Sequence, residues 1–444
     1  MKIFFLWIAI LGLPVVLRAD EPAGGSRIAP DDWPQFRGPR GDGLSTAVDL
    51  PLTWSETKNI TWKRAVAGRG LSSPVVLGGR IWMTTALETA ATNEEKAKQL
   101  TGRKYKGALA VAMTISLRVL GFDRKTGKLL HNVEVFRVNG PDPIDKRNSY
   151  ASPTPVAEPG RVYCDFGTYG TVCLDSSTGK IIWKRRLPID HQVGPGSSPI
   201  LCDDLLVLVR DGRDAQYVTA LKKQTGKTVW KTNRPPIDSD NEFKKGFSSP
   251  LLFKADGRRQ IVVPGAKWVV SYDPPTGKQL WQVEYGKGYS NVPTPVFGHG
   301  LAFVCTDFPG NQLWAIRVNG RGDVTGSHVV WKMKKQMPKK TSPLLVGGEI
   351  YTVSDGGVAT CLDGRTGASL WTRRIGGNYA ASPVCAEGRI YYFSEEGKTT
   401  VIRSGRKLKT LAENHLKGRV MASPAVAARA IFLRTDTHLY RIEK

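Results

Sequence analysis

The chain has 444 residues, 41% hydrophobic and 23% charged, which is ordinary for a globular protein and excludes a disordered or fibrous one. Its formal net charge of +25 favours anionic partners such as lipid head groups, acidic polysaccharides or acidic proteins, although such a surplus can also serve solubility alone. The six cysteines include no CxxC pair and no two histidines have ligand spacing, so the composition disfavours a metal site.

The first nineteen residues have the pattern of a signal peptide. Lys2 precedes an apolar run over 3–17, and Ala19 offers a small residue for cleavage. The run is too short to span a membrane comfortably, and no second apolar run approaches spanning length. We therefore expect residues 1–19 to be removed and 20–31 to form a flexible leader. The mature protein would then be a soluble monomer in the periplasm or outside the cell, where nucleic acid is a disfavoured partner.

A repeat of about 40–50 residues runs along the rest of the chain. Each unit opens on a Ser-Pro or Thr-Pro dipeptide, followed by a short apolar run, a turn and a second strand. The starts are Ser73-Pro74, Ser152-Pro153, Ser198-Pro199, Ser249-Pro250, Thr294-Pro295, Ser342-Pro343, Ser382-Pro383 and Ser423-Pro424. A period of this length predicts a repeat architecture in which each unit is one supersecondary element.

A second signature closes most units, with Asp, then Thr-Gly and then Trp at fixed spacing. It occurs in full at 174–183, 272–281 and 362–371, and with one position changed at 122–131 and 221–230. A sixth copy carries an insertion and ends at Trp331, and a seventh, 402–411, has lost both Thr-Gly and Trp. Thr-Gly indicates a tight turn in which glycine supplies the positive φ. The Trp then lies on the following outer strand, where its ring can wedge between adjacent units.

Four strands per unit and radial repetition predict an all-β fold, an eight-bladed β-propeller of four-stranded antiparallel blades over residues 32–444. The last unit ends after three strands, and residues 59–65 read as its missing outer strand. Ring closure by this N-terminal strand leaves no exposed sheet edge. Residues 88–107, polar and with helical potential, are predicted to be an insertion in the first blade.

A propeller usually binds ligands at one end of its channel, where the segments leading into the inner strands meet the turns after the second strands. Polar residues occupy these positions in nearly every blade. We predict a ligand-binding ring of Arg69, Tyr150, His191, Asp211, Lys245, Lys267, Trp268, Asn291, Asp307, Lys340, Asp355, Tyr379, Glu395, Arg419 and Asp436. Asp and Asn are also expected in solvated turns, so turn chemistry alone could account for single members.

Catalytic motifs are absent: the chain has neither a Gly-x-Ser-x-Gly elbow nor an HExxH sequence. His191 lies beside Asp190 and could act as a base, but the spacing supplies no nucleophile. The Lys residues of the Thr-Gly-Lys turns would form a basic face at the opposite end. Cys164 and Cys173 flank a short turn, so they are either a disulfide pair across a two-residue loop at 168–169 or two buried thiols on strands.

The recurring D-x-x-T-G-K-x-x-W signature resembles the PQQ-binding-like repeat over roughly 33–444. The segments 32–43, 148–156, 194–201 and 377–384 are similar to bacterial exported PQQ-like propeller proteins. The resemblance extends to quinoprotein alcohol dehydrogenases, which hold PQQ and calcium in the channel beneath two adjacent cysteines that this chain lacks. It extends also to the cofactor-free propeller lipoprotein of the outer-membrane β-barrel assembly machinery, a protein-binding scaffold.

Two functions follow from these resemblances. In the first, the protein is a non-enzymatic scaffold without a cofactor or metal, and its channel mouth engages a protein segment or an anionic surface polymer. In the alternative, it is a PQQ- and calcium-dependent oxidoreductase acting on alcohols or sugars, with Trp268 or Tyr169 as the aromatic floor beneath the cofactor.

Overall fold

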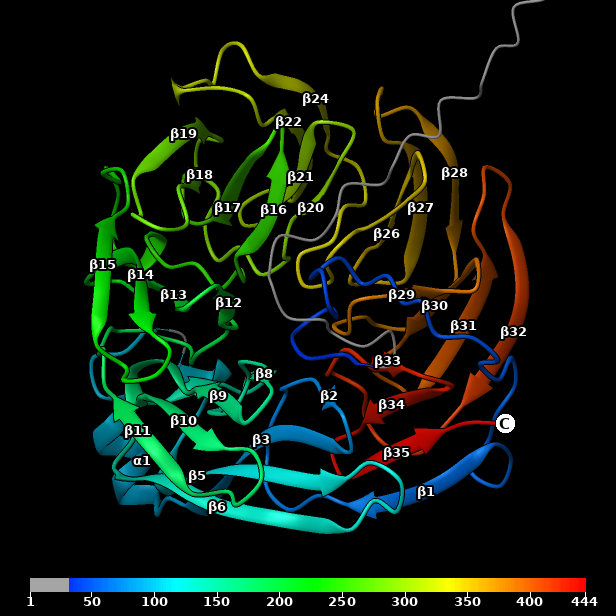
Figure 1. Cartoon of the computed structure of the whole chain (residues 1–444). Coiled ribbons are helices and arrows are strands. Elements are labelled where there is room, and N and C mark those ends of the chain that lie inside the picture. Colours follow the sequence, from blue (N-terminus) through cyan, green and yellow to red (C-terminus); the bar gives the residue numbers. More distant parts are fainter. Residues whose placement is uncertain (1–31, 105) are drawn as a thin grey trace, which may run out of the picture.

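The computed structural model describes residues 32–104 and 106–444; the predicted signal peptide and leader lie outside them. Within the described residues the chain forms eight antiparallel blades around a central channel, with each inner strand nearest the centre and each outer strand at the rim (Figure 1). This confirms the predicted eight-bladed all-β propeller.

The first four blades follow one another along the chain. Blade 1 comprises β2 (Val75–Leu77), β3 (Arg80–Ala90), β5 (Ala112–Asp123) and β6 (Leu129–Asn139); blade 2, β8 (Val156–Glu158), β9 (Arg161–Asp165), β10 (Thr171–Asp175) and β11 (Ile181–Arg185); blade 3, β12 (Ile200–Cys202), β13 (Leu205–Asp211), β14 (Gln216–Lys222) and β15 (Thr228–Asn233); blade 4, β16 (Leu251–Ala255), β17 (Arg258–Pro264), β18 (Trp268–Tyr272) and β19 (Gln279–Glu284).

The last four blades complete the ring. Blade 5 comprises β20 (Val296–Gly298), β21 (Leu301–Thr306), β22 (Gln312–Arg317) and β24 (Val329–Met333); blade 6, β25 (Leu344–Val346), β26 (Glu349–Val353), β27 (Val358–Asp363) and β28 (Ser369–Arg374); blade 7, β29 (Val384–Ala386), β30 (Arg389–Phe393), β31 (Lys398–Arg403) and β32 (Lys409–His415); blade 8, β33 (Ala425–Ala427), β34 (Ala430–Arg434), β35 (His438–Ile442) and β1 (Ile60–Ala65).

The outer strand of blade 8 comes from the N-terminal part of the chain, as predicted. Strand β1 pairs antiparallel with β35, and Lys63 lies opposite Tyr440. Trp62 on β1 is buried and packs against Phe432 of β34. Because β1 covers the free edge of β35, the two ends of the ring are joined within one sheet.

In the described chain the tryptophan of the blade signature fastens five of the eight blades to the next. The indole N–H of Trp230 in blade 3 donates to the carbonyl of Pro274 in the Thr-Gly turn of blade 4, with 3.0 Å between N and O. A side chain on Gly277 of that turn, whose φ is 69°, would clash with the Trp230 ring. Equivalent bonds join Trp62 to Arg124, Trp183 to Lys223, Trp331 to Gly364 and Trp371 to Gly405. The predicted wedge between adjacent units is confirmed.

The Ser/Thr-Pro residues form a second inter-blade device, a belt of hydroxyls around the channel that we call the hydroxyl ring. The backbone N–H of one blade's residue donates to the hydroxyl of the next, at 2.8–3.0 Å. In the described chain six such links run from Ser73 to Thr154, Thr154 to Ser198, Ser198 to Ser249, Thr294 to Ser342, Ser342 to Ser382 and Ser382 to Ser423. The buried hydroxyls of Thr294 and Ser73 have no partner, so the ring is interrupted at the blade 4–blade 5 and blade 8–blade 1 boundaries.

Two local predictions are wrong. Blade 2 begins at Thr154-Pro155, not at Ser152-Pro153, because Thr154 supplies the ring hydroxyl and β8 starts two residues later. The register predicted for Cys164 and Cys173 is shifted by one residue, since Cys164 faces Val172 across the ladder. A one-residue shift sends the two side chains to opposite faces of the sheet, and all six cysteines, which lie in the described part of the chain, are free.

Insertions decorate two blades. In blade 1 the segment between β3 and β5 contains α1 (Asn93–Leu100), capped by Thr92 and Glu95, and β4 (Leu109–Ala110), which pairs with β7 (Ile144–Asp145). In blade 5 the insertion carries β23 (Gly322–Asp323), which runs parallel to the outer strand of blade 4. No helix in residues 32–104 or 106–444 is long and apolar enough to cross a membrane.

Residues 32–50, which we call the plug, line the inner strands at the end of the channel opposite the predicted mouth. Trp33 exchanges backbone hydrogen bonds with Val76 of β2, at 2.7 and 2.8 Å. Further bonds run from Ala157 in β8 to Pro34, and between the segment 43–45 and Cys385 in β29. In Figure 1 this dark-blue segment runs from the ring centre towards β1 at the rim. The plug therefore satisfies edge groups that the inner strands would otherwise leave unpaired.

Candidate functional site

The segments leading into the inner strands and the turns after the second strands gather at one end of the ring, which we call the channel mouth. Its best-connected part spans blades 6 to 8. The ammonium of Lys340 lies 3.0 Å from Glu395 and 3.6 Å from Asp355, and the guanidinium of Arg419 binds Glu395 through two nitrogens. Asp436 accepts the backbone N–H of Arg419 at 3.0 Å. Five residues predicted from the sequence thus form one network.

This network holds two cations and three carboxylates, and its cations are partly open to solvent. Burial opposes ionisation of Glu395, but hydrogen bonds from Arg419 and Lys340 hold its pKa below the usual value. The side chains of Lys340 and Arg419 remain 31% and 46% exposed. Cations held in place yet accessible can exchange partners with an incoming charged group at little desolvation cost.

Arg147 extends the network across the channel, and the predicted ring missed it. It belongs to the loop before blade 2, opposite blades 6 and 7 in an eight-membered ring. Its ion pair with Asp145 raises the pKa of the guanidinium, and the charges of Asp355 and Glu395 add to that effect. Its side chain is 73% exposed. The only sequence signal for Arg147 was its place in a long loop beside an acidic residue.

The boundary between blades 4 and 5 holds a second part of the mouth. Asn291, fully buried, donates to the carbonyl of Gly265 at 2.8 Å and accepts the backbone N–H of Asp307 at 2.8 Å. Asp307 is 9% exposed, one of its carboxyl oxygens has no hydrogen-bond partner, and burial raises its pKa to about 7. A cavity of about 220 Å³ opens beside it, lined by Tyr285, Lys287, Gly288, Thr306, Asp307, Pro309, Gly310 and Gln312.

Aromatic side chains from neighbouring loops pack together near that cavity, without lining it. Tyr289 packs against Phe243 and Phe308, with ring centroids 4.9 and 5.4 Å apart. Phe308 is 50% exposed, and the ammonium of Lys339 lies 5.9 Å from its ring centroid. Lys245 is nearly buried beside Tyr289, donates to the carbonyl of Glu242 at 2.6 Å, and has its pKa lowered to about 8 by burial.

Four predicted ring residues serve blade packing. Tyr150 is buried and donates to the carbonyl of Asp142, and Tyr379 is buried in the core between blades 6 and 7. Trp268 lies in the core between blades 3 and 4, with its indole N–H on Pro236. Asp211 is buried in a two-fold hydrogen-bonded ion pair with Arg234. These four side chains are buried in blade packing, and their role in ligand binding stays a prediction.

The remaining predicted residues lie at the mouth without joining either cluster. Arg69 is half-buried, and its guanidinium donates to the carbonyl of Lys146. Lys267 lies 3.5 Å from Glu284 and over the Trp268 ring. His191 accepts the backbone N–H of Thr168 at 3.0 Å, and burial lowers its pKa to about 3. A histidine that stays neutral down to pH 3 and is already hydrogen-bonded is a poor general base at neutral pH.

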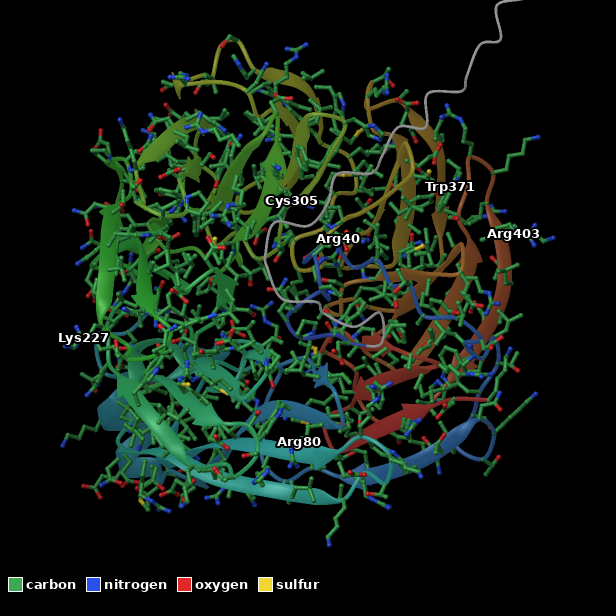
Figure 2. All side chains as sticks on the ribbon, viewed as in Figure 1. Arg40, Arg80, Lys227, Cys305, Trp371 and Arg403 are labelled. Atoms are coloured by element: carbon green, nitrogen blue, oxygen red, sulfur yellow. The ribbon has the colours of Figure 1, made fainter. Side chains whose placement is uncertain are left out.

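The predicted ring also missed a buried cation in the plug. Arg37 of the plug is 1% exposed and donates to the carbonyls of Asp42, Pro343 and Pro383, at 2.7, 2.6 and 3.4 Å. Burial lowers its pKa to about 10. Arg40 of the same segment is seen near the ring centre in Figure 2, with Cys305 of blade 5 close by in that view. No sequence pattern marks Arg37, because two of its carbonyl partners, Pro343 and Pro383, lie far along the chain.

Comparison with known proteins shows to which family the chain belongs. The family model described as outer membrane protein assembly factor BamB (PQQ_2) matches residues 45–232 and 265–444. The chain belongs to this family. BamB of Moranella endobia is 22% identical over 64% of this chain and 72% of its own length, and BamB of Burkholderia pseudomallei is 24% identical over 63% and 70%.

Other relatives differ in activity. A tetrathionate hydrolase of Acidithiobacillus ferrooxidans is 26% identical over 40% of this chain, a match that spans only 36% of that enzyme. Among solved structures, BamB of Moraxella catarrhalis covers 82% of the chain and 99% of its own length with a TM-score of 0.53. The quinohemoprotein alcohol dehydrogenase of Comamonas testosteroni covers 94% and 81% with the same score. Both are 14% identical to this chain, a level that shows the shared propeller fold alone.

In the described part of this BamB-family chain, the two residues predicted as the floor beneath a quinone do not fit that role. Both candidate floor residues are packed away: Trp268 is 8% exposed in the core of blades 3 and 4, and Tyr169 is 7% exposed with its ring edge on Tyr150. The described residues hold no group of three His, Cys, Asp or Glu side chains placed to bind a metal ion. These described residues do not fit PQQ or calcium.

Proposed function

We propose that this protein is an exported, non-enzymatic scaffold whose channel mouth binds a segment of another protein. Membership of a family named for outer membrane protein assembly supports a scaffolding role. The plug occupies the opposite end of the channel, so a partner engages the mouth without threading through the ring. The observation that carries the proposal is the network of Lys340, Glu395 and Arg419, joined across the channel by the charge of Arg147.

The chemistry of this network favours a polypeptide over an anionic polymer. Carboxylates and cations alternate in it, with Asp355 and Glu395 set between Lys340, Arg419 and Arg147. A uniformly anionic chain would meet the carboxylates with like charge, whereas a peptide can present both signs and match the pattern. The exposed Phe308 beside it adds an apolar contact that a polysaccharide or phosphate polymer does not need.

A photo-crosslinking experiment in the native cell tests this function. A photoreactive residue at position 147, on the mouth, is expected to give a discrete protein adduct. The same residue at position 227, in the Thr-Gly-Lys turn of blade 3 at the outer edge of Figure 2, is expected to give none. Adding Glu395→Gln and Arg419→Met should reduce the adduct at position 147, because these changes remove a charge of each sign from the network.

Three results would contradict the proposal. Equal adducts from both positions would show that the mouth is not the binding surface. Retention on a polyanion column that the two charge changes abolish, with no protein adduct, would favour an anionic polymer. A quinone absorbance band on titration with PQQ and Ca²⁺ would favour an oxidoreductase instead.

A further inference from the structure

The cavity at the blade 4–blade 5 boundary is suited to one kind of chemical group. Its volume of about 220 Å³ corresponds to roughly seven water-sized groups at about 30 Å³ each. That is too small for a redox cofactor, since ligand pockets for drug-sized molecules span roughly 300–1,000 Å³. It matches the side chain of a single long amino acid.

One hydrogen-bond acceptor in a residue that lines the cavity has no donor. Asp307 has one carboxyl oxygen buried without a partner, although its backbone N–H is bound by Asn291. In the described chain no Lys, Arg or His lies within ion-pair distance of this carboxyl, unlike Asp355 and Glu395. A buried polar atom left unpaired destabilises the protein, so a ligand donor that reaches it is favoured.

The charged groups around Asp307 leave room for a further cation. Lys340 is engaged by Asp355 and Glu395, and Lys339 lies over the Phe308 ring. Lys287 lines the cavity and is exposed to solvent. Burial and the charge of Asp355 raise the pKa of the Asp307 carboxyl, whereas Lys339, Lys340 and a backbone hydrogen bond from Phe308 lower it. The net shift is upward, so these groups compensate its negative charge only in part.

The remaining walls accept a planar or extended cation. Tyr285, fixed by hydrogen bonds to the carbonyls of Gly265 and Trp268, turns its ring to one side of the cavity. Thr306 and Gln312 supply neutral polar groups, and Phe308 stands exposed next to Asp307. A carboxylate with aromatic rings beside it is a combination that recognises ammonium and guanidinium groups.

We propose that this cavity is a pocket for one arginine or lysine side chain of the protein segment that docks at the channel mouth. The identity of the segment rests on the proposed function, but the pocket itself does not. The cationic head pairs with Asp307 at the floor, and its aliphatic stem passes the Tyr285 ring. The hydroxyl ring is interrupted at the same blade boundary, where the buried hydroxyl of Thr294 is also unpartnered.

The pocket is tested with small probes on the full chain. Saturation-transfer NMR is recorded with Nα-acetyl-arginine amide, with its neutral isostere Nα-acetyl-citrulline amide, and with Nα-acetyl-glutamate amide. Only the arginine probe should give a saturable signal at pH 8. Its affinity should fall about fivefold on going from pH 7 to pH 6, because protonation of Asp307 removes the anion that the probe pairs with.

Two variants locate the binding. Asp307→Asn should weaken the arginine probe at least tenfold, whereas Asp256→Asn, the same change in an exposed turn at the opposite end of blade 4, should not alter it. Gly310→Leu fills the cavity from its rim, where a Cβ at position 310 would meet no atom within 4 Å, so this variant folds and should also lose the probe.

Each contrary outcome overturns a defined statement. Equal binding of the citrulline or glutamate probe, or binding unchanged in Asp307→Asn and Gly310→Leu, would sink the pocket. If the probes behave as expected but no adduct forms at position 147, the pocket stands and the docking function fails. If the adduct forms and the arginine probe does not bind, the docking function stands and the pocket fails.

Discussion

At the scale of single residues, the mouth separates polar side chains that hold the loops from those that face outward. Asn291 and Asp211 have all their bonding directed into the protein, while Arg147 and Arg419 keep exposed guanidinium groups. Turn chemistry predicts polar residues at these positions but cannot separate the two classes. Burial is decided by neighbours in the next blade, tens of residues away, so the sequence could not show that Tyr150 and Trp268 lie in core clusters.

Asp307 gives a prediction about stability and pH. Its pKa in the folded protein, about 7, lies above the ordinary value of 3.8. A raised carboxyl pKa means that the native state binds the proton more tightly, so stability falls as pH rises from about 4 to about 7. Asp307→Asn should therefore raise the free energy of unfolding by about 2–4 kcal/mol at pH 8 and have little effect at pH 4. Denaturant unfolding of both proteins at the two pH values measures this.

The effects of the other titrating groups cancel when Asp307→Asn and the unchanged protein are compared at the same pH. Asp256→Asn serves as the control. An equal gain at both pH values would mean that Asn improves packing and that titration of Asp307 is not the cause.

At the scale of elements, the blade is specified by two local signatures that make long-range bonds. The Thr-Gly turn and the Trp of the outer strand could be predicted because both depend on nearby sequence. Their mutual contact lies between blades, where Trp230 meets the turn at Gly277. Trp281 of blade 4 departs from the rule: it is fully buried and donates to Gln260, and the blade 5 insertion pairs beside it. Inserted residues can redirect a signature side chain in ways that spacing does not show.

A matched pair of substitutions tests how much the hydrogen bonds of the hydroxyl ring contribute to stability. Ser342→Ala removes the acceptor of the buried Thr294 N–H and should cost about 1–3 kcal/mol of stability. Thr294→Val removes a buried hydroxyl that has no partner, so it should be neutral or stabilising by up to about 1 kcal/mol. Thermal or urea unfolding of both variants checks the difference. Comparable losses in the two would show that the ring bonds do not decide the stability of these positions.

At the scale of the whole molecule, the N-terminal part of the chain joins the ring in two places. The plug spans the inner strands, and Arg37 binds carbonyls at the start of blades 6 and 7. Strand β1 then completes blade 8. The number of blades and the closing strand could be predicted because the repeat count leaves one outer strand missing. The plug could not, since its bonds run from irregular backbone to strand edges and leave no periodic pattern.

Closure by β1 predicts the association state of truncated chains. A chain that begins at residue 67 lacks β1 and exposes the edge of β35, whose N–H and C=O groups can then pair with another molecule. A chain that begins at residue 51 loses the plug but keeps β1. Light scattering after gel filtration should show concentration-dependent oligomers for the first and a monomer for the second. Monomers of both at every concentration would mean that the β35 edge is protected by something other than β1, and oligomers of both would assign that protection to the plug.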